Sequence, residues 1–375
     1  MSLDIYSPYW MEQAIHDLPV QYSFFKDRYF NSTILFPQEK VVVDYDDGEG
    51  NIMAPFVLPR VGDVPLIREG YETYELTPPY ISVSLPLSID DLLKRQIGES
   101  IMSDRTPEQR EKVYLTNDLA TLDKAIARRE EWMCVNTMLD NACTMTHIGQ
   151  NGDKGKDITA QYYEDDDNPG VFTVSEAWDT AEDEYTPGNW FTDVCDQLSD
   201  MRAAGREATD LIVGPNVADL ILTDKWAWKH MDIRRDNLGE IDPRWGVAGI
   251  TRIGRLNFRG HDLEIFCYEG TYQERDVETG TLTTVPYFPE DAVLLCAPGT
   301  GIFRYGAVTQ MEDDRQFHTR AAARVPKYVA NTEHNQRKTI LTSRPLAAPK
   351  LKGQWRACRD VFTASSEEEE ETTEE

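Results

Sequence analysis

Hydrophobic and polar residues alternate along residues 81–88. The apolar positions are Ile81, Val83, Leu85 and Leu87, and the positions between them are Ser82, Ser84, Pro86 and Ser88. A period of two predicts a half-buried β-strand. Because proline cannot donate a ladder hydrogen bond, Pro78, Pro79 and Pro86 indicate a strand at a sheet edge. The pattern leaves open whether this chain or another one covers the apolar side.

The sequence from 106 to 141 predicts a single long helix. Thr106 suits the N-cap, Pro107 suits the first helical position, and Gln109 completes a capping box. Large apolar residues recur at helical spacing and should form the core side: Leu115, Leu119, Leu122, Ile126 and Met133. We expect charged residues to fill the other side: Asp118, Lys124, Arg128, Arg129, Glu130 and Glu131. The rod would be roughly 50 Å long, which suits an elongated subunit better than a small compact enzyme.

Aromatic residues crowd the chain before residue 40, at Phe24, Phe25, Tyr29, Phe30 and Phe36. This segment either packs on its own subunit or reaches another one. Residues 40–90 then predict strands that are interrupted by prolines and bend at glycines. Little inside this β-rich stretch could cover its apolar side.

Residues 188–308 predict a mixed α/β domain with its own core. In order, we expect a helix from its N-cap Asn189 to Gly205, a buried strand at 211–214, a helix at 216–224, a hairpin turning at Arg259–Gly260 and a further turn at 278–280. Strand patterns return at 321–331 and 339–349.

Composition narrows the classes of function. The 375 residues suffice for two or three domains. Lys and Arg number 38 against 66 Asp and Glu, and the formal net charge of −28 argues against a protein that reads nucleic-acid sequence. The chain has no apolar run of eighteen residues, and its acidic start does not resemble a signal peptide. We therefore expect neither a membrane span nor secretion.

Two basic segments, 252–260 and 315–324, stand out in this acidic chain. We interpret them as partners for the carboxylates of a neighbouring subunit. Binding to nucleic acid is the alternative for the same cations.

No motif indicates a catalytic centre. The segment 299–306 fails the dinucleotide-binding pattern because Arg304 stands where its third glycine belongs, and no two of the six histidines are four residues apart. The six cysteines form no C-x-x-C pair, and Cys267 and Cys296 lie in apolar runs, so we expect small buried side chains. We predict no catalytic residue, no cofactor and no bound metal.

An ordered series of segments resembles the major capsid proteins of lambda-type tailed phages. The segments are 24–47 with its F-F-x-x-x-Y-F opening, 52–81 with A-P-x-V and T-P-x-Y, 248–272, 287–308 and 323–349. Each segment alone is only moderately specific, and the order of all of them is stronger. The resemblance covers about residues 20–350 and leaves the acidic end of the chain outside.

The resemblance implies an α+β fold, the tailed-phage (Hong Kong 97-type) major capsid fold. Mapped onto this sequence, its parts are an N-terminal arm at 1–49, an extended β-hairpin loop at 50–90, a peripheral domain at 91–187 with the spine helix at 106–141, an axial domain at 188–308, peripheral return strands at 309–351 and an acidic, disordered tail at 352–375.

The resemblance also implies a function. Copies would self-assemble as hexamers and pentamers into an icosahedral phage head in the bacterial host cytoplasm, enclosing double-stranded DNA without sequence-specific binding. We expect the extended loop to contact the neighbouring copy through Tyr71, Tyr74, Leu76, Ile81 and Val83. Some relatives crosslink their shells through a loop lysine, but no lysine lies between Lys40 and Lys94. We therefore expect a noncovalent shell, reinforced by a decoration protein and built with a separate scaffolding protein and a portal.

Two other functions stay open at this point. A cellular nanocompartment shell of the same fold would enclose enzymes instead of DNA. An α/β enzyme centred on 188–308 would need a pocket with perturbed titrating groups, and the sequence names none.

Overall fold

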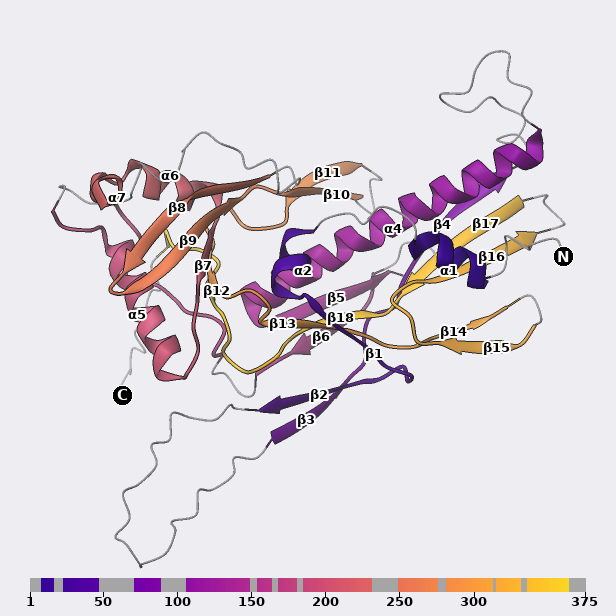
Figure 1. The fold of residues 1–375 in the computed structure, drawn as a ribbon, viewed down its shortest axis with the longest axis horizontal. Coiled ribbons are helices and arrows are strands. Elements are labelled where there is room, and N and C mark those ends of the chain that lie inside the picture. The colour runs from indigo at the N-terminus through magenta and orange to yellow at the C-terminus, as the bar shows by residue number, and fades with distance from the viewer. Residues whose placement is uncertain are drawn as a thin grey trace, which may run out of the picture.

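The computed structural model describes residues 8–16, 23–46, 71–88, 106–148, 154–163, 168–180, 185–230, 249–275, 281–312, 315–331 and 336–363. Within them, a long helix connects two packed bodies (Figure 1). One body lies along the N-terminal half of this helix, and the other surrounds a mixed five-stranded sheet near its C-terminal end. The subunit is accordingly elongated.

The long helix, α4, spans Pro107–Asp140 and has 34 residues, which makes it about 50 Å long. Its N-cap is Thr106, and the predicted capping box with Gln109 is present in both directions. It ends at Asn141, which adopts the left-handed conformation with φ of 51°. Along the predicted apolar side, one residue is half-buried and the others are buried: Leu115, then Leu119, Leu122, Ile126 and Met133.

The alternating segment forms β4 (Ile81–Ser88), which lies at the edge of a three-stranded antiparallel sheet with β17 (Gln336–Ser343) and β16 (Val325–Asn331). Its half-buried apolar side chains pack against α4 and β17, with Ile81, Val83 and Leu85 set against Leu122, Ile126 and Leu341. This chain therefore covers its own strand. Ile81 and Val83, two of the predicted intersubunit contacts, pack against α4 and β17 of their own subunit and are half-buried there, and their intersubunit role stays a prediction.

The five-stranded sheet has the order β19 (Arg356–Cys358), β12 (Val293–Cys296), β7 (Asp210–Val213), β9 (His261–Tyr268) and β8 (Ile250–Phe258). Successive residues of its inner strands enter two different cores, so that Ile212 joins one core and Leu211 the other. The hairpin between β8 and β9 turns at Arg259 and Gly260, as predicted, with φ of 48° and 98°. Positive φ at both positions is typical of a type I′ turn.

Three helices cover one face of this sheet: α5 (Asn189–Ala203), α6 (Pro215–Thr223) and α7 (Lys225–His230). The N-cap of α5 is Gly188, not Asn189. Position 188 requires glycine because the chain approaches closely there, and a Cβ would lie 2.4 Å from the carbonyl oxygen of Asp179. The Asn189 side chain instead accepts a hydrogen bond from the Asp179 amide and donates one to Ala177.

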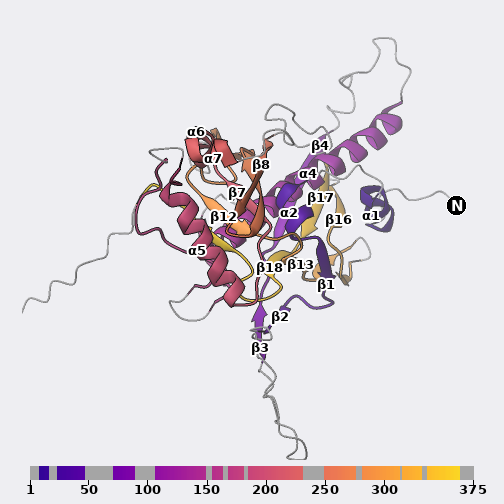
Figure 2. The same cartoon turned by 60° about the vertical axis from the view of Figure 1, so that its left-hand side comes forward.

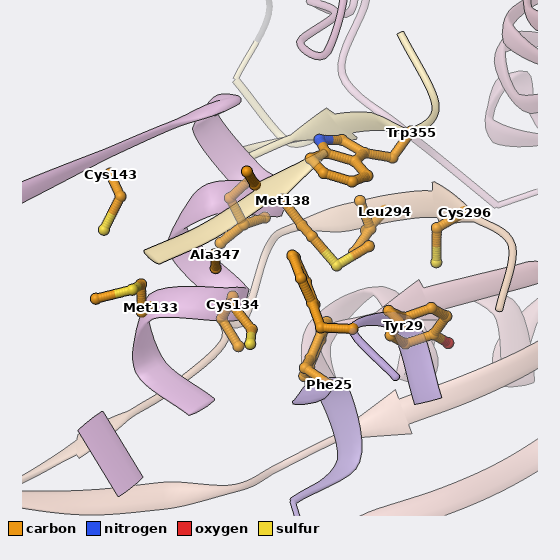
Figure 3. Close-up of a cluster of buried hydrophobic side chains, with 14 of the residues drawn as sticks. Phe25, Tyr29, Met133, Cys134, Met138, Cys143, Leu294, Cys296, Ala347 and Trp355 are labelled. Carbon is orange, nitrogen blue, oxygen red and sulfur yellow. The ribbon is translucent and has the colours of Figure 1, made fainter. Parts of the chain in front are cut away.

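The aromatic segment near the N-terminus packs on its own subunit. It contains the helix α2 (Phe24–Tyr29), which is followed by the strand β1 (Ser32–Leu35). Strand β1 pairs in parallel with β13 (Gly301–Tyr305), and β13 pairs on its other side with β18 (Pro345–Pro349). Phe24, Phe25 and Tyr29 are fully buried. Figure 3 shows Phe25 and Tyr29 of α2 among side chains of α4, β12 and the 347–355 region. This part of the expected arm is therefore a component of the core. The short helix α1 (Pro8–His16) lies against β16 and α4.

Four two-stranded antiparallel ribbons complete the fold among the described residues. They are β2 (Val41–Asp46) with β3 (Tyr71–Leu76), β5 (Ala142–Ile148) with β6 (Lys154–Gln161), β10 (Thr271–Arg275) with β11 (Leu282–Pro286), and β14 (Val308–Met311) with β15 (Phe317–Arg320). The β2/β3 ribbon projects away from both bodies in two views (Figure 2). Residues 50–70 and 89–90 of the expected extended loop (50–90), the end of the expected arm at 47–49, and the predicted turn at 278–280 lie outside the described residues.

Two predicted boundaries do not match the sheets. The expected tail from 352 is folded as far as residue 363, with Trp355 and Val361 buried and β19 in the five-stranded sheet. The low-complexity acidic run begins only after this point, outside the described residues. In the other direction, β13 precedes the expected boundary at 308 but pairs with β1 and β18. Because the acidic run dominates the composition of this region, the prediction wrongly included the apolar residues before it in the tail.

All six cysteines are buried free thiols, as predicted for Cys267 and Cys296. No helix in the described ranges combines the length and the apolar character needed to cross a membrane.

Candidate assembly site

A buried ionic cluster fastens the N-terminal segment to the long helix. Glu130 of α4 is fully buried, and its carboxylate lies 2.6 Å from the Arg324 guanidinium and 2.7 Å from the Lys26 ammonium. The Tyr305 hydroxyl donates to the same carboxylate at 2.9 Å. A second nitrogen of Arg324 bonds Asp123, about two turns before Glu130 on α4, at 2.8 Å. Four separate segments of the chain therefore meet at one side chain.

The charge of Glu130 is stabilised despite its burial. Burial alone would raise the pKa of its carboxyl, but Arg324 and Lys26 outweigh that effect and lower the pKa to about 2. A carboxylate with two cations and a hydroxyl around it keeps its hydrogen-bonding capacity satisfied. The cluster is thus suited to holding parts of the subunit together and leaves no free group for proton transfer.

The neighbouring acid, Glu131, has a different environment. It is also buried, and it accepts backbone hydrogen bonds from Phe25 at 2.9 Å and Lys26 at 3.1 Å, at the start of α2. Tyr268 of β9 donates to it at 3.4 Å. Burial raises the pKa of Glu131 to about 7, and the two amides oppose that rise only in part. Glu131 therefore caps α2 from another helix without any cation as a partner in the described ranges.

A second set of contacts joins α2 to the five-stranded sheet. Arg28 bonds the carboxylate of Asp210 at 2.6 Å, and the Tyr29 hydroxyl donates to the same oxygen at 2.8 Å. The Arg28 guanidinium also lies 4.9 Å from the centre of the Phe266 ring. Because α2 bonds α4 on one side and β7 on the other, it fixes the position of one body relative to the other.

The basic segments act mainly within the chain. Arg324 pairs with Glu130, and Arg320 of β15 pairs with Glu312 at 2.7 Å. In the other segment, three exposed arginines have carboxylate partners in this chain: Arg252 with Glu264, Arg255 with Asp262 and Arg259 with Asp196. The interpretation that these cations await a neighbour's carboxylates is wrong for the pairs that the structure contains.

The remaining predicted contact residues lie on β3. Its register sets Tyr74 opposite Val43 and Tyr71 opposite Asp46. The side chains of both tyrosines lie outside the described part of the chain, and their intersubunit role stays a prediction. Leu76 is half-buried and packs on the core of its own subunit.

Exposed apolar side chains occur elsewhere, on ribbons that the sequence did not single out. Phe317 and Met311 form a cross-strand pair on the β14/β15 ribbon and are 73% and 42% exposed. Leu282 on β11 is 65% exposed, and Ile34 and Leu35 are exposed on the edge strand β1. Large exposed apolar residues on projecting elements are typical of surfaces that bind another protein. Phe317 could have been identified from the sequence, because it is an apolar residue with polar neighbours in a four-residue strand.

The arrangement gives no sign of a reaction centre in the described ranges. Within them, no group of three or more histidine, cysteine, aspartate and glutamate side chains is placed to hold a metal ion. The carboxyl groups of Glu130 and Glu131 have strongly shifted pKa values, and both bond the N-terminal segment.

Comparisons with known proteins agree with this reading. The family model of phage major capsid protein E matches residues 9–357. Two curated relatives are the P21 prophage-derived major head protein of Escherichia coli O6:H1 strain CFT073 and the major capsid protein of Enterobacteria phage P21. Each is 24% identical over 289 residues, which cover 76% of this chain and 78% of the relative.

The fold has a similar experimental structure. A crystal structure of an Escherichia coli CFT073 prophage protein, described as a capsid protein, superimposes with a TM-score of 0.64 at 15% sequence identity. The match covers 94% of this chain and 98% of the other. Since the family model spans nearly all of the described residues, the chain belongs to the phage major capsid protein E family and is a structural protein of the virion capsid, not an enzyme.

Proposed function

We propose that copies of this chain assemble as hexamers and pentamers into the icosahedral head of a tailed phage that encloses double-stranded DNA. The observation that carries the proposal is the family match over residues 9–357. The relatives named as major head and capsid proteins favour this function over a nanocompartment shell. The long helix and the two bodies joined by α2 supply a rigid elongated unit that can tile a surface.

The exposed apolar residues on the ribbons are the proposed contact points between copies. Phe317 and Met311 would bury their side chains on one neighbour, and Leu282 on another. Burial of apolar surface stabilises an interface by about 25 cal/mol for each Å² removed from water. A few such anchors suffice where every subunit makes the same contacts many times.

The proposed shell is noncovalent. The segment between Lys40 and Lys94 has no lysine, so a crosslink from a lysine of the extended loop has no donor there. Mechanical reinforcement would then come from a separate decoration protein on the outside, with a scaffolding protein and a portal as further assembly partners.

Electron microscopy of the purified, full-length protein tests the proposal. Closed shells, or rings of five and six subunits, are the expected particles, and a uniform population of small single particles would contradict it. Denaturing gels of the same shells should show one band at the subunit mass of 42.9 kDa. A ladder of higher masses would contradict the noncovalent shell while leaving the head function intact.

A further inference from the structure

Three half-buried aromatic side chains and two exposed arginines meet where the β10/β11 ribbon lies beside α4 (Figure 1). We call them the aromatic–arginine patch: Arg128, Arg129 and Trp132 of α4, Tyr272 of β10, and Tyr287, which follows β11. At about 100° per residue, the three α4 side chains fall in one sector of the helix about 100° wide, with Trp132 between the two arginines. The helix therefore presents them together on one side.

The side chains of the patch contact one another. The Arg129 guanidinium lies 5.0 Å from the centre of the Trp132 ring, and the ring centres of Tyr272 and Tyr287 are 4.8 Å apart. Burial raises the pKa of Tyr287 to about 12, and the charges of Arg128 and Arg129 oppose that rise. Burial also raises the pKa of Tyr272, and there Arg129 and Trp132 oppose the rise. The helix and the ribbon thus form one surface.

The patch has the composition of a binding surface. Trp132 and Tyr287 pack on the main core with part of each side chain and leave the rest accessible to solvent. Tryptophan, tyrosine and arginine are the residue types that dominate binding energies at protein interfaces. Guanidinium groups bind carboxylates in a bidentate geometry and also stack on aromatic rings. The partner that fits is therefore an acidic peptide segment.

Positive charge predominates at the patch. Neither of its arginines has an ion pair in the described ranges, where the ion pairs of α4 are those of Glu111, Asp123, Glu130 and Asp140. The exposed acid beside the patch is Glu274, next to Tyr272. Asp118 lies on the same side of α4 but is half-buried and about 16 Å away along the helix axis. An added carboxylate would therefore meet a net positive surface.

An acidic segment of this chain begins within reach of the patch. Residues 364–375 contain seven glutamates, five of them consecutive at 367–371. The Val361 amide donates a hydrogen bond to the Asp291 carbonyl at 3.1 Å, and Asp291 is four residues after Tyr287. Since an extended chain spans at most about 3.6 Å per residue, Thr363 lies within about 30 Å of Tyr287. Twelve further residues reach up to about 40 Å, which is enough to bring glutamates to the patch.

We propose that residues 364–375 bind the aromatic–arginine patch of their own subunit, with glutamate carboxylates paired to Arg128 and Arg129. Adjacent glutamates repel one another, and the two guanidinium groups relieve part of that repulsion. Each exposed pair is weak alone, but the tether holds the segment at a high effective concentration. The contact covers the patch in the unassembled subunit and weakens as salt rises. It goes beyond the proposed head function, because it lies within one subunit and does not require assembly.

A nitroxide spin label on the acidic segment of the full-length, unassembled subunit tests the proposal. Thr373→Cys supplies the attachment point, and the label reacts there because all six native cysteines are buried. We expect a slow-motion component in the electron paramagnetic resonance spectrum at low salt, and we expect it to shrink several-fold at high salt. A spectrum that shows only fast motion at low salt would overturn the proposal.

Two double variants of the labelled subunit identify the surface. The test variant carries Arg128→Gln and Arg129→Gln, and the control carries Arg252→Gln and Arg255→Gln on β8. Each loses two positive charges, which changes the net charge from −28 to −30. We expect the slow-motion component to fall several-fold in the test variant only, with circular dichroism showing that both variants are folded. Equal components in the two variants would contradict binding at the patch.

Carbodiimide crosslinking of the unaltered protein gives a second readout that needs no variant. The reagent joins a carboxylate to a lysine, and the exposed Lys124 lies about one turn before Arg128 on α4. In free subunits we expect crosslinks from Lys124 to glutamates of 367–375, several-fold more than from Lys112, which is about 18 Å further along the helix. Equal yields at the two lysines, or none at Lys124, would overturn the proposal.

The same reaction shows which copy supplies the segment. Unlabelled subunits are mixed with isotopically heavy ones before the reagent is added, and the crosslinked peptides are measured by mass spectrometry. We expect each crosslink at Lys124 to join two peptides of the same isotope. Crosslinks between light and heavy peptides would overturn the proposal, because the segment of a second copy would then occupy the patch.

Discussion

The guanidinium of Arg324 lies 2.6 Å from the carboxylate of Glu130, although 194 residues separate them in the sequence. Both side chains are removed from water, with 12% and 0% of their surface exposed. The pair connects the long helix to the strand region after β15, and Lys26 adds the N-terminal segment. The pair therefore has a structural function in the subunit, and removal of either partner should lower the free energy of unfolding.

Replacing Arg324 with methionine should destabilise the subunit strongly. Glu130 would remain buried with Lys26 as its only cation, and removal of one partner of a buried pair typically costs about 3–5 kcal/mol. Chemical denaturation of the unassembled subunit measures this loss. Arg255→Ala is the control, because Arg255 and Asp262 form a pair that is about half exposed, for which a loss of about 1 kcal/mol or less is typical. If both variants lost a similar amount of free energy of unfolding, burial of the Arg324–Glu130 pair would not explain its contribution to stability.

Stability should fall between about pH 4.5 and pH 7 because of Glu131. Its pKa is raised from 4.5 to about 7 in the folded subunit. Below pH 4.5 the carboxyl is protonated in both states, and as the pH rises the unfolded chain releases the proton first. The free energy of unfolding therefore decreases across this window, by on the order of 3 kcal/mol from this group.

Glu131→Gln checks that assignment. The amide cannot ionise, so the fall in stability across this pH window should be smaller by about the same amount in the variant. Denaturation curves at several pH values provide the comparison, with Glu108→Gln, at an exposed position of α4, as the control. An unchanged pH dependence in Glu131→Gln would show that another group titrates.

Phe317→Ser should leave the subunit folded and impair shell assembly. The side chain is 73% exposed in the monomer, so its removal takes little away from the core. The expected result is normal thermal unfolding with a several-fold lower yield of shells in light scattering and microscopy. Tyr185→Ser is a matched control, since Tyr185 is 80% exposed and is not part of any described strand. If both variants assemble like the wild type, the β14/β15 ribbon is not a contact.

Tyr74→Asp tests the extended-loop contact. We expect a folded subunit with impaired assembly, because a charge placed at an apolar intersubunit contact remains unpaired. Circular dichroism and shell yield separate the two effects. Unfolding of the isolated subunit would mean that Tyr74 packs within its own subunit, as the residue opposite it on β2, Val43, does.

Assembly should weaken at low ionic strength. Copies with a net charge of −28 repel one another, and salt screens that repulsion over distances of about 10 Å at 0.1 M. Light scattering at a fixed subunit concentration over a range of salt concentrations measures the effect. A flat response would indicate that the acidic residues are kept apart in the shell.

Local sequence patterns predicted helix ends and turns correctly where one residue type determines the backbone conformation. The capping box at Thr106 and the Arg259–Gly260 turn follow from backbone chemistry that the sequence shows directly. The partner of the 81–88 strand did not follow, because periodicity identifies an apolar side but not what lies on it. The burial of Glu130 and Glu131 was missed for a similar reason, since helical spacing cannot distinguish a solvated acid from a buried one. The partner that neutralises Glu130, Arg324, lies 194 residues away in the sequence.

The folding of the five-stranded sheet depends on contacts between distant parts of the chain. Its strands come from segments between residues 210 and 358, and one of its faces is covered by Phe24 and Tyr29. Such a high contact order slows folding. Until β19 has paired, the edge of β12 offers free backbone groups to any strand nearby, including one from a sibling chain. In a cell that fills quickly with identical subunits, the yield of intact heads would then depend on how fast each chain closes this sheet as well as on how stable it becomes.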